Sequence, residues 1–164
     1  DSELNLRLIE NYGKSIYISD SIKSWYFPRS SYFNLFKQYF RYGRGRFLTK
    51  VLHPKGSPVR GLTPFLFICF LMLYGLIDLI TISDQYFPEF VGVLAGIVLF
   101  ETLRVVITKR EKFKNEIWKG NRKKPNMISL WANTITSVIV MQVGHFSGFL
   151  YQLCKRVFLG KRGW

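Results

Sequence analysis

The stretch TPFLFICFLMLYGLIDLITI, residues 63–82, decides the fold because it holds one charged residue in 20 positions. About 20 apolar residues, at a helical rise of about 1.5 Å each, cross the ~30 Å hydrocarbon core of a bilayer. A second segment of the same length, PEFVGVLAGIVLFETLRVVI at residues 88–107, is separated from the first by an acidic turn, SDQYFPE. Together they predict a transmembrane helical hairpin over residues 63–107.

Basic residues are concentrated outside this hairpin. The chain has 24 Lys and Arg against 10 Asp and Glu, a net charge of +14; 11 of the basic residues precede residue 63 and eight lie in residues 108–126. The acidic turn has none. Because positively charged flanks stay in the cytoplasm, we expect a multi-pass protein of the inner (plasma) membrane with both outer stretches on the cytoplasmic side.

The composition excludes several classes of protein. With 48% hydrophobic and 17% aromatic residues, the chain is neither disordered nor collagen-like. Cys69 and Cys154 are too far apart in sequence to indicate a disulfide-stapled scaffold, and with His53 and His145 they lack metal-ligand spacing, so we predict no metal site. Nucleic-acid binding is not expected, because membrane topology already accounts for the divided basic residues.

A third apolar segment begins at Met127, after the basic loop of residues 108–126, and continues to about Val143. Beyond it two rules conflict. A single crossing places the C-terminus outside, whereas the basic residues favour the inside, namely Lys155, Arg156, Lys161 and Arg162. We predict one crossing followed by a basic amphipathic tail, with a re-entrant or interfacial ending as the alternative.

Residues 1–62 are mixed in character and compatible with water. The segment ELNLRLIE predicts a short helix that Gly13 ends, and KSIYISDSIKSWYF, residues 14–27, alternates enough for one or two β-strands. Ser30 or Ser31 can cap a following helix over residues 31–46. That helix interleaves aromatic and basic residues, which predicts a helix lying in the membrane surface.

Three charged residues within the apolar segments need an account. Glu101 and Arg104 are three residues apart, so we expect them to pair on one helix face. Asp78 is expected near the outer surface and away from Arg104. His145, among small residues in VGHFSG, is interpreted as a packed histidine, with contact to a lipid acceptor as the alternative.

Side chains that could bind a ligand are most concentrated in QYFRYGRGR, residues 38–46, which groups an amide, aromatic rings and three arginines. Arg binds phosphate oxygens in a bidentate fork, and Gly43 and Gly45 could let the backbone approach a ligand. A diphosphate is the natural partner. The other interpretation is a solvated or lipid-binding basic face, which requires only the sum of charge.

This pattern resembles the C-terminal part of the membrane-bound family 2 glycosyltransferases, in particular the bacterial exopolysaccharide (succinoglycan-like) branch. The resemblance rests on DSELNLRL, on QYFRY about 37 residues later, and on the apolar hairpin. In that family an acidic pair followed by x-Glu-Leu ends the GT-A catalytic domain, and the second acid is the general base. Asp1, Glu3 and Leu4 match this motif, which implies that Asp1 is catalytic.

A second family motif, Gln-x-x-Arg-Trp, lies on an interfacial helix and contacts the donor diphosphate. Gln38, Arg41 and Tyr42 match it, with Tyr in place of Trp, and the GRGR that follows adds Arg44 and Arg46 to the implied substrate-binding residues. The resemblance implies a nucleotide-sugar donor and a lipid-linked or polysaccharide acceptor. It also implies a divalent cation, Mg or Mn, whose Asp-x-Asp ligands would lie upstream, so these residues alone are expected to be inactive.

The predicted fold is an α-helical membrane protein with about three transmembrane helices, preceded by an α/β remnant of a GT-A domain and an interfacial amphipathic helix. The alternative is a small non-catalytic membrane protein that binds anionic lipid or a partner subunit. The predicted segments are the GT-A remnant, the interfacial helix with its linker, the hairpin, the basic loop, and the third span with its tail, at 1–29, 30–62, 63–107, 108–126 and 127–164.

Overall fold

The computed structural model describes residues 2–13, 19, 21, 29–54, 59–81, 86–112 and 126–160. These residues form helices and connecting turns, and none of them lies in a strand. The elements are α1 (Ser2–Tyr12), α2 (Tyr32–Leu52), the 3₁₀ turn η1 (Val59–Gly61), α3 (Thr63–Thr81), α4 (Tyr86–Lys112) and α5 (Met127–Leu159). The strands predicted within residues 14–27 fall almost wholly outside the described residues, so the GT-A remnant stays a prediction.

Three helices are long and apolar enough to cross a membrane: α3 over Thr63–Thr81, α4 over Tyr86–Lys109, and α5 over Met127–Leu159. This confirms the predicted hairpin and third segment as helices of spanning length. Most of their apolar side chains are exposed, as lipid-facing side chains are. Three hydroxyls within α5 are satisfied by their own helix, since Thr134, Thr136 and Ser137 each donate to the backbone carbonyl four residues earlier.

Local sequence sets the helix ends. Gly13 ends α1 with a positive φ of 68° and donates its N–H to the Ile9 carbonyl at 2.9 Å, as predicted. Ser31 is the N-cap of α2, its Oγ accepting from the Asn34 N–H at 3.3 Å. Asn126 caps α5 in the same way, its Oδ1 accepting from the Ser129 N–H at 2.7 Å.

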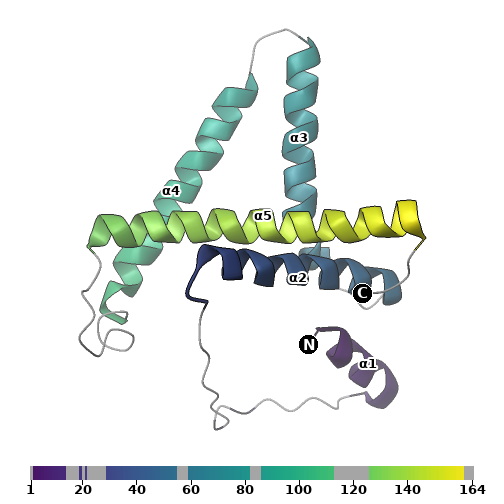
Figure 1. Ribbon diagram of the computed structural model, residues 1–164. Coiled ribbons are helices and arrows are strands. Elements are labelled where there is room, and N and C mark those ends of the chain that lie inside the picture. The colour runs from purple at the N-terminus through teal and green to yellow at the C-terminus, as the bar shows by residue number, and fades with distance from the viewer. Residues whose placement is uncertain are drawn as a thin grey trace. The chain divides into compact units, whose positions relative to one another are not determined.

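Helix α5 is 33 residues long and runs without a break to Leu159, as Figure 1 shows. The tail predicted after about Val143 is therefore a continuation of the same helix. The physical reason is that no proline interrupts the segment, and Gly160, with φ of 61°, is the residue that ends it.

The chain divides into two compact units, one formed by residues 1–69 and 140–164 and the other by residues 70–139. In the first unit, Phe47 and Leu48 of α2 and Phe149 of α5 form the buried core. Phe65 of α3 stacks on Phe149, with ring centroids 4.3 Å apart. Helix α1 joins this unit through Glu10, whose carboxylate lies 2.9 Å from Nδ1 of His53.

In the second unit, aromatic side chains hold the hairpin together. Tyr74 of α3 contacts Phe87 and Phe90 of α4 edge to face, with centroids 5.7 and 5.4 Å apart. Helix α4 also contacts the first part of α5, where Nε1 of Trp131 donates to Oγ1 of Thr102 at 3.0 Å. The N–H of a half-buried tryptophan between two apolar helices thus has an acceptor.

Candidate functional site

The predicted motif Gln-x-x-Arg-Tyr lies on α2 and its ends are hydrogen-bonded to each other. Nε2 of Gln38 donates to Oη of Tyr42 at 2.8 Å. Residues three and four apart share one helix face, so Arg41 lies beside this pair. Arg41 and Tyr42 are exposed, and the Tyr42 ring also contacts Tyr39 edge to face at 5.4 Å. The structure therefore brings Gln38, Arg41 and Tyr42 together on one exposed face.

A further residue, Arg29, joins this face from the segment before α2. Its Nε donates to Oε1 of Gln38 at 3.3 Å, so the Gln38 amide is bonded at both its oxygen and its nitrogen. Sequence reasoning missed Arg29, because it lies nine residues from Gln38 and outside the helical repeat. The only signal in the sequence was a basic residue two positions before the Ser31 cap.

Arg44 and Arg46 are placed differently from Arg41. Nε of Arg44 donates to Oε1 of Gln152 at 3.1 Å, and its guanidinium lies over the Tyr151 ring, 5.4 Å from the centroid. Gln152 is fully buried. Arg46 packs along Gly61, where an added Cβ would lie 3.2 Å from Cδ of Arg46. Arg44 is thus held against α5 and Arg46 against Gly61, both within the first unit.

Glycines allow α2 and α5 to approach closely. A Cβ at Gly43 would lie 2.1 Å from the His145 carbonyl oxygen, and one at Gly148 would lie 1.9 Å from the Phe40 carbonyl oxygen. A Cβ at Gly144 would lie 2.9 Å from the Phe36 carbonyl oxygen. Gly43 was interpreted as letting the backbone approach a ligand, but the close partner is the backbone of α5. The motif helix is thereby fixed to a membrane-length helix.

His145 lies in this close contact and is buried. The structure describes no hydrogen-bond partner for its Nδ1. Its burial where α5 packs on α2 agrees with the interpretation of a packed histidine. The phenyl ring of Phe146, next to it, stacks on Phe65 at 5.3 Å, so apolar neighbours dominate this part of α5.

The intramembrane charges are arranged as the spacing predicts, with one addition. Nε of Arg104 donates to Oε2 of Glu101 at 2.8 Å, which confirms the predicted pair. Oδ2 of Asp78 accepts from the N–H of Phe87 at 3.4 Å. Asp78 therefore caps the start of α4, where a carboxylate compensates free N–H groups and the helix dipole.

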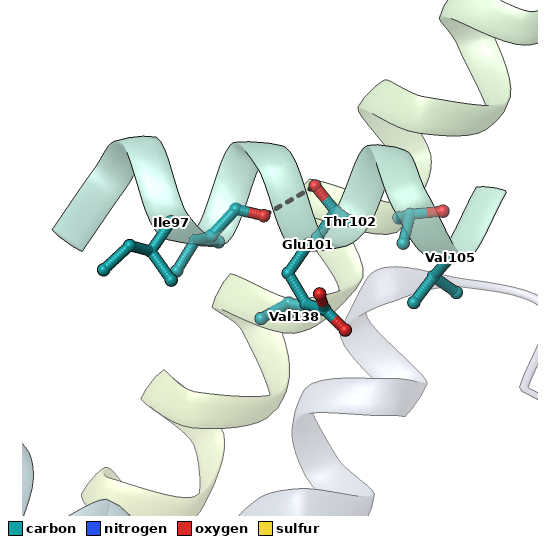
Figure 2. Close-up of a pocket in the computed structure, with 7 residues that line it drawn as sticks. Ile97, Glu101, Thr102, Val105 and Val138 are labelled. Carbon is teal, nitrogen blue, oxygen red and sulfur yellow. Dashed lines mark hydrogen bonds between the residues drawn. The ribbon is translucent and has the colours of Figure 1, made fainter. Parts of the chain in front are cut away.

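Helices α4 and α5 also border a groove of about 310 Å³ in the second unit. Its lining is apolar apart from Glu101 and the hydroxyls of Thr102 and Thr134. Figure 2 shows Thr102 hydrogen-bonded back to its own helix, through the 2.8 Å bond to the Val98 carbonyl. A groove of this composition fits hydrocarbon rather than a charged substrate.

Other predicted elements of the site have no structural test. Asp1 lies outside the described residues. Among the described residues no group of three His, Cys, Asp or Glu side chains is placed to hold a metal ion. The divalent cation that the resemblance implies therefore stays a prediction.

Comparison of the chain with family models, with curated proteins and with solved structures finds no match. The fold itself defines the class. The chain is an α-helical membrane protein with three helices of spanning length, and α2 carries an exposed Gln-x-x-Arg-Tyr face packed through glycines on α5.

Proposed function

We propose that this chain is the C-terminal membrane part of an inverting family 2 glycosyltransferase. The enzyme transfers a sugar from a nucleotide-sugar donor to a lipid-linked or polysaccharide acceptor at the cytoplasmic face of the inner membrane. The observation that carries the proposal is the hydrogen bond from Gln38 to Tyr42 beside the exposed Arg41. It makes three motif residues one preorganised surface.

The Tyr that stands in place of the family's Trp fits this surface chemically. An indole N–H is a donor only, whereas a phenol oxygen also accepts. Tyr42 accepts from the Gln38 amide and so holds its ring in one orientation. The substitution keeps an aromatic face for stacking and gains a contact that fixes the face.

Sugar transfer needs positive charge where the leaving nucleoside diphosphate develops negative charge, and it needs a base at the acceptor hydroxyl. Arg41 supplies a planar fork of donors that matches phosphate oxygens. Asp1 is the base in this proposal, removing the acceptor proton as the oxygen attacks the anomeric carbon.

The position of α2 suits an acceptor that is tethered to the membrane. Its glycine contacts with α5 fix the motif helix to a helix of spanning length. A lipid-linked acceptor presents its reactive end at the bilayer surface, where an interfacial helix with exposed aromatic residues lies.

The test is transfer of a radiolabelled sugar to an extractable lipid or polysaccharide, in membranes containing the complete natural polypeptide. Arg41→Lys keeps the charge but removes the fork, so we expect transfer to fall at least about tenfold. Lys37→Gln is the matched control, because it removes a cation from the same helix outside the motif, and it should retain transfer. Equal activity of Arg41→Lys and wild type would refute the proposal.

A second candidate function is binding of anionic lipid or a partner without catalysis. It is favoured by the exposed rings of Tyr32 and Phe33, with the Lys37 ammonium 4.2 Å from the Phe33 ring centroid. Lipid binding depends on total charge, so flotation with phosphatidylglycerol vesicles should weaken equally in Arg41→Gln and Lys37→Gln. Arg41→Lys separates the two candidates. It should leave lipid binding unchanged, because the charge is kept, whereas it should reduce sugar transfer.

A further inference from the structure

Arg29 has the features of a ligand-binding residue rather than of a structural cation. It is exposed, and its one described polar contact is the 3.3 Å bond from Nε to Oε1 of Gln38. Among the described residues no carboxylate pairs with Arg29 or with Arg41. A guanidinium held by its Nε at a fixed amide keeps a defined plane, which a solvated surface arginine does not.

Gln38 fixes the positions of its neighbours. Its amide oxygen accepts from Arg29 and its amide nitrogen donates to Tyr42 at 2.8 Å. Tyr42, Gln38 and Arg29 thus form a continuous row of hydrogen-bonded side chains that joins α2 to the segment before its N-cap. Arg41, three residues after Gln38, lies on the same face of the helix.

We propose that Arg29 and Arg41 are the two arms of a diphosphate-binding site, and that Gln38 is its positioning residue. Each guanidinium matches one phosphoryl group through a charge-assisted fork of hydrogen bonds. The role of this site rests on the proposed function, because that proposal assigns the donor diphosphate to α2.

A diphosphate at this surface has two sources, a nucleoside diphosphate from the cytoplasm or a diphosphate headgroup of a polyprenyl lipid. Both present the same two phosphoryl groups to the two arginines. Only the second carries a hydrocarbon chain, which would gain affinity from a membrane or micelle.

The experiment is a titration of inorganic pyrophosphate into the complete natural polypeptide in neutral maltoside micelles, at fixed ionic strength, with heat as the readout. Arg29→Ala should weaken binding about tenfold or more, the loss of a charge-assisted fork. Arg29→Lys should lose most of that affinity, because lysine cannot hold the Gln38 contact and present a fork. Lys37→Gln, with the same change of charge as Arg29→Ala, should stay within about twofold of wild type.

Gln38→Leu tests the positioning role, because it leaves both arginines in place and removes the acceptor for Arg29. Its pyrophosphate affinity should fall, and combining it with Arg29→Ala should cause little further loss, since both changes remove one arm. Independent, additive losses would show that Gln38 contacts the ligand itself and would overturn the positioning role.

Competition identifies the source of the diphosphate. Uridine or guanosine diphosphate binding tighter than pyrophosphate supports a nucleotide site, and farnesyl diphosphate binding tighter supports a lipid headgroup.

Unaltered pyrophosphate affinity in Arg29→Ala, or an equal loss in Lys37→Gln, would overturn the proposed site. Sugar transfer that survives Arg29→Ala with unaltered pyrophosphate binding refutes this site alone. Absence of transfer with retained pyrophosphate binding refutes the proposed function alone.

Discussion

The contact between α2 and α5 predicts that Gly148→Ala is strongly destabilising. The added Cβ would lie 1.9 Å from the Phe40 carbonyl oxygen, 2.7 Å from its carbon and 2.9 Å from its Cα. All three atoms belong to the backbone, so no rotamer change relieves the overlap. The usual closest approach of carbon to a carbonyl oxygen is about 3.3 Å, and the helices must therefore separate by roughly 1.4 Å.

The loss of stability follows from the packing contacts that are weakened when α2 and α5 separate. A radial gap of about 0.5–1 Å already forfeits a quarter to a half of a dispersion contact. The aromatic pairs Phe47–Phe149 and Phe40–Tyr151, with centroids at 5.2 and 5.7 Å, span this contact. Each such pair contributes about 0.5–1.5 kcal/mol. With the strain of overpacking, we expect a loss of about 3 kcal/mol, against a gain of at most ~1 kcal/mol from helix propensity.

The assay is thermal unfolding in maltoside micelles, followed by circular dichroism. A loss of about 3 kcal/mol lowers the Tm by roughly 6–12 °C in a chain of this size. Gly96→Ala is the matched control, because nothing lies within 4 Å of its added Cβ in a helix of the other unit. A Gly148→Ala protein as stable as the Gly96→Ala protein would refute the close contact of α2 with α5.

Three other contacts give measurable effects. Gln152→Leu leaves Nε of Arg44 without its buried acceptor and should lower the free energy of unfolding by about 1.5–3 kcal/mol, measured by thermal unfolding. Adding Arg44→Met should recover part of that loss, and no recovery would argue against the Arg44–Gln152 pair. Thr102→Val removes the 3.0 Å acceptor of Trp131 Nε1 and should cost about 0.6 kcal/mol. The specific readout is an altered Trp131 emission spectrum, measured in a protein whose other tryptophans, Trp25, Trp118 and Trp164, are replaced by Phe. Asp78→Ala should speed hydrogen exchange at the capped amide that starts α4, whereas Asp78→Asn, which keeps a side-chain oxygen, should not.

Much of the fold follows from local sequence. The apolar segments predict helices of spanning length because hydropathy and length act over one segment at a time. The ends at Gly13 and Ser31 are predicted because a cap depends on residues within one turn. The Glu101–Arg104 pair is likewise a matter of spacing on one helix.

Contacts between helices are not predictable in this way. A helical glycine can face lipid, as Gly96 faces open space, or another backbone, as Gly148 does, and local sequence does not separate the two. Nothing near Arg44 in the sequence points to Gln152, 108 residues away. Arg41 and Arg44 look equivalent in the motif, yet only Arg41 lies on the exposed face, because partners on α5 decide where each arginine packs.

The release of nucleoside diphosphate from a panel of nucleotide sugars tests the central claim most directly. It is measured in membranes that contain the complete natural polypeptide and in membranes that lack it. The account predicts release from at least one donor, reduced about tenfold or more by Arg41→Lys and maintained in Lys37→Gln. Release no greater than in membranes lacking the protein, or equal release from the wild-type and Arg41→Lys proteins, would contradict it.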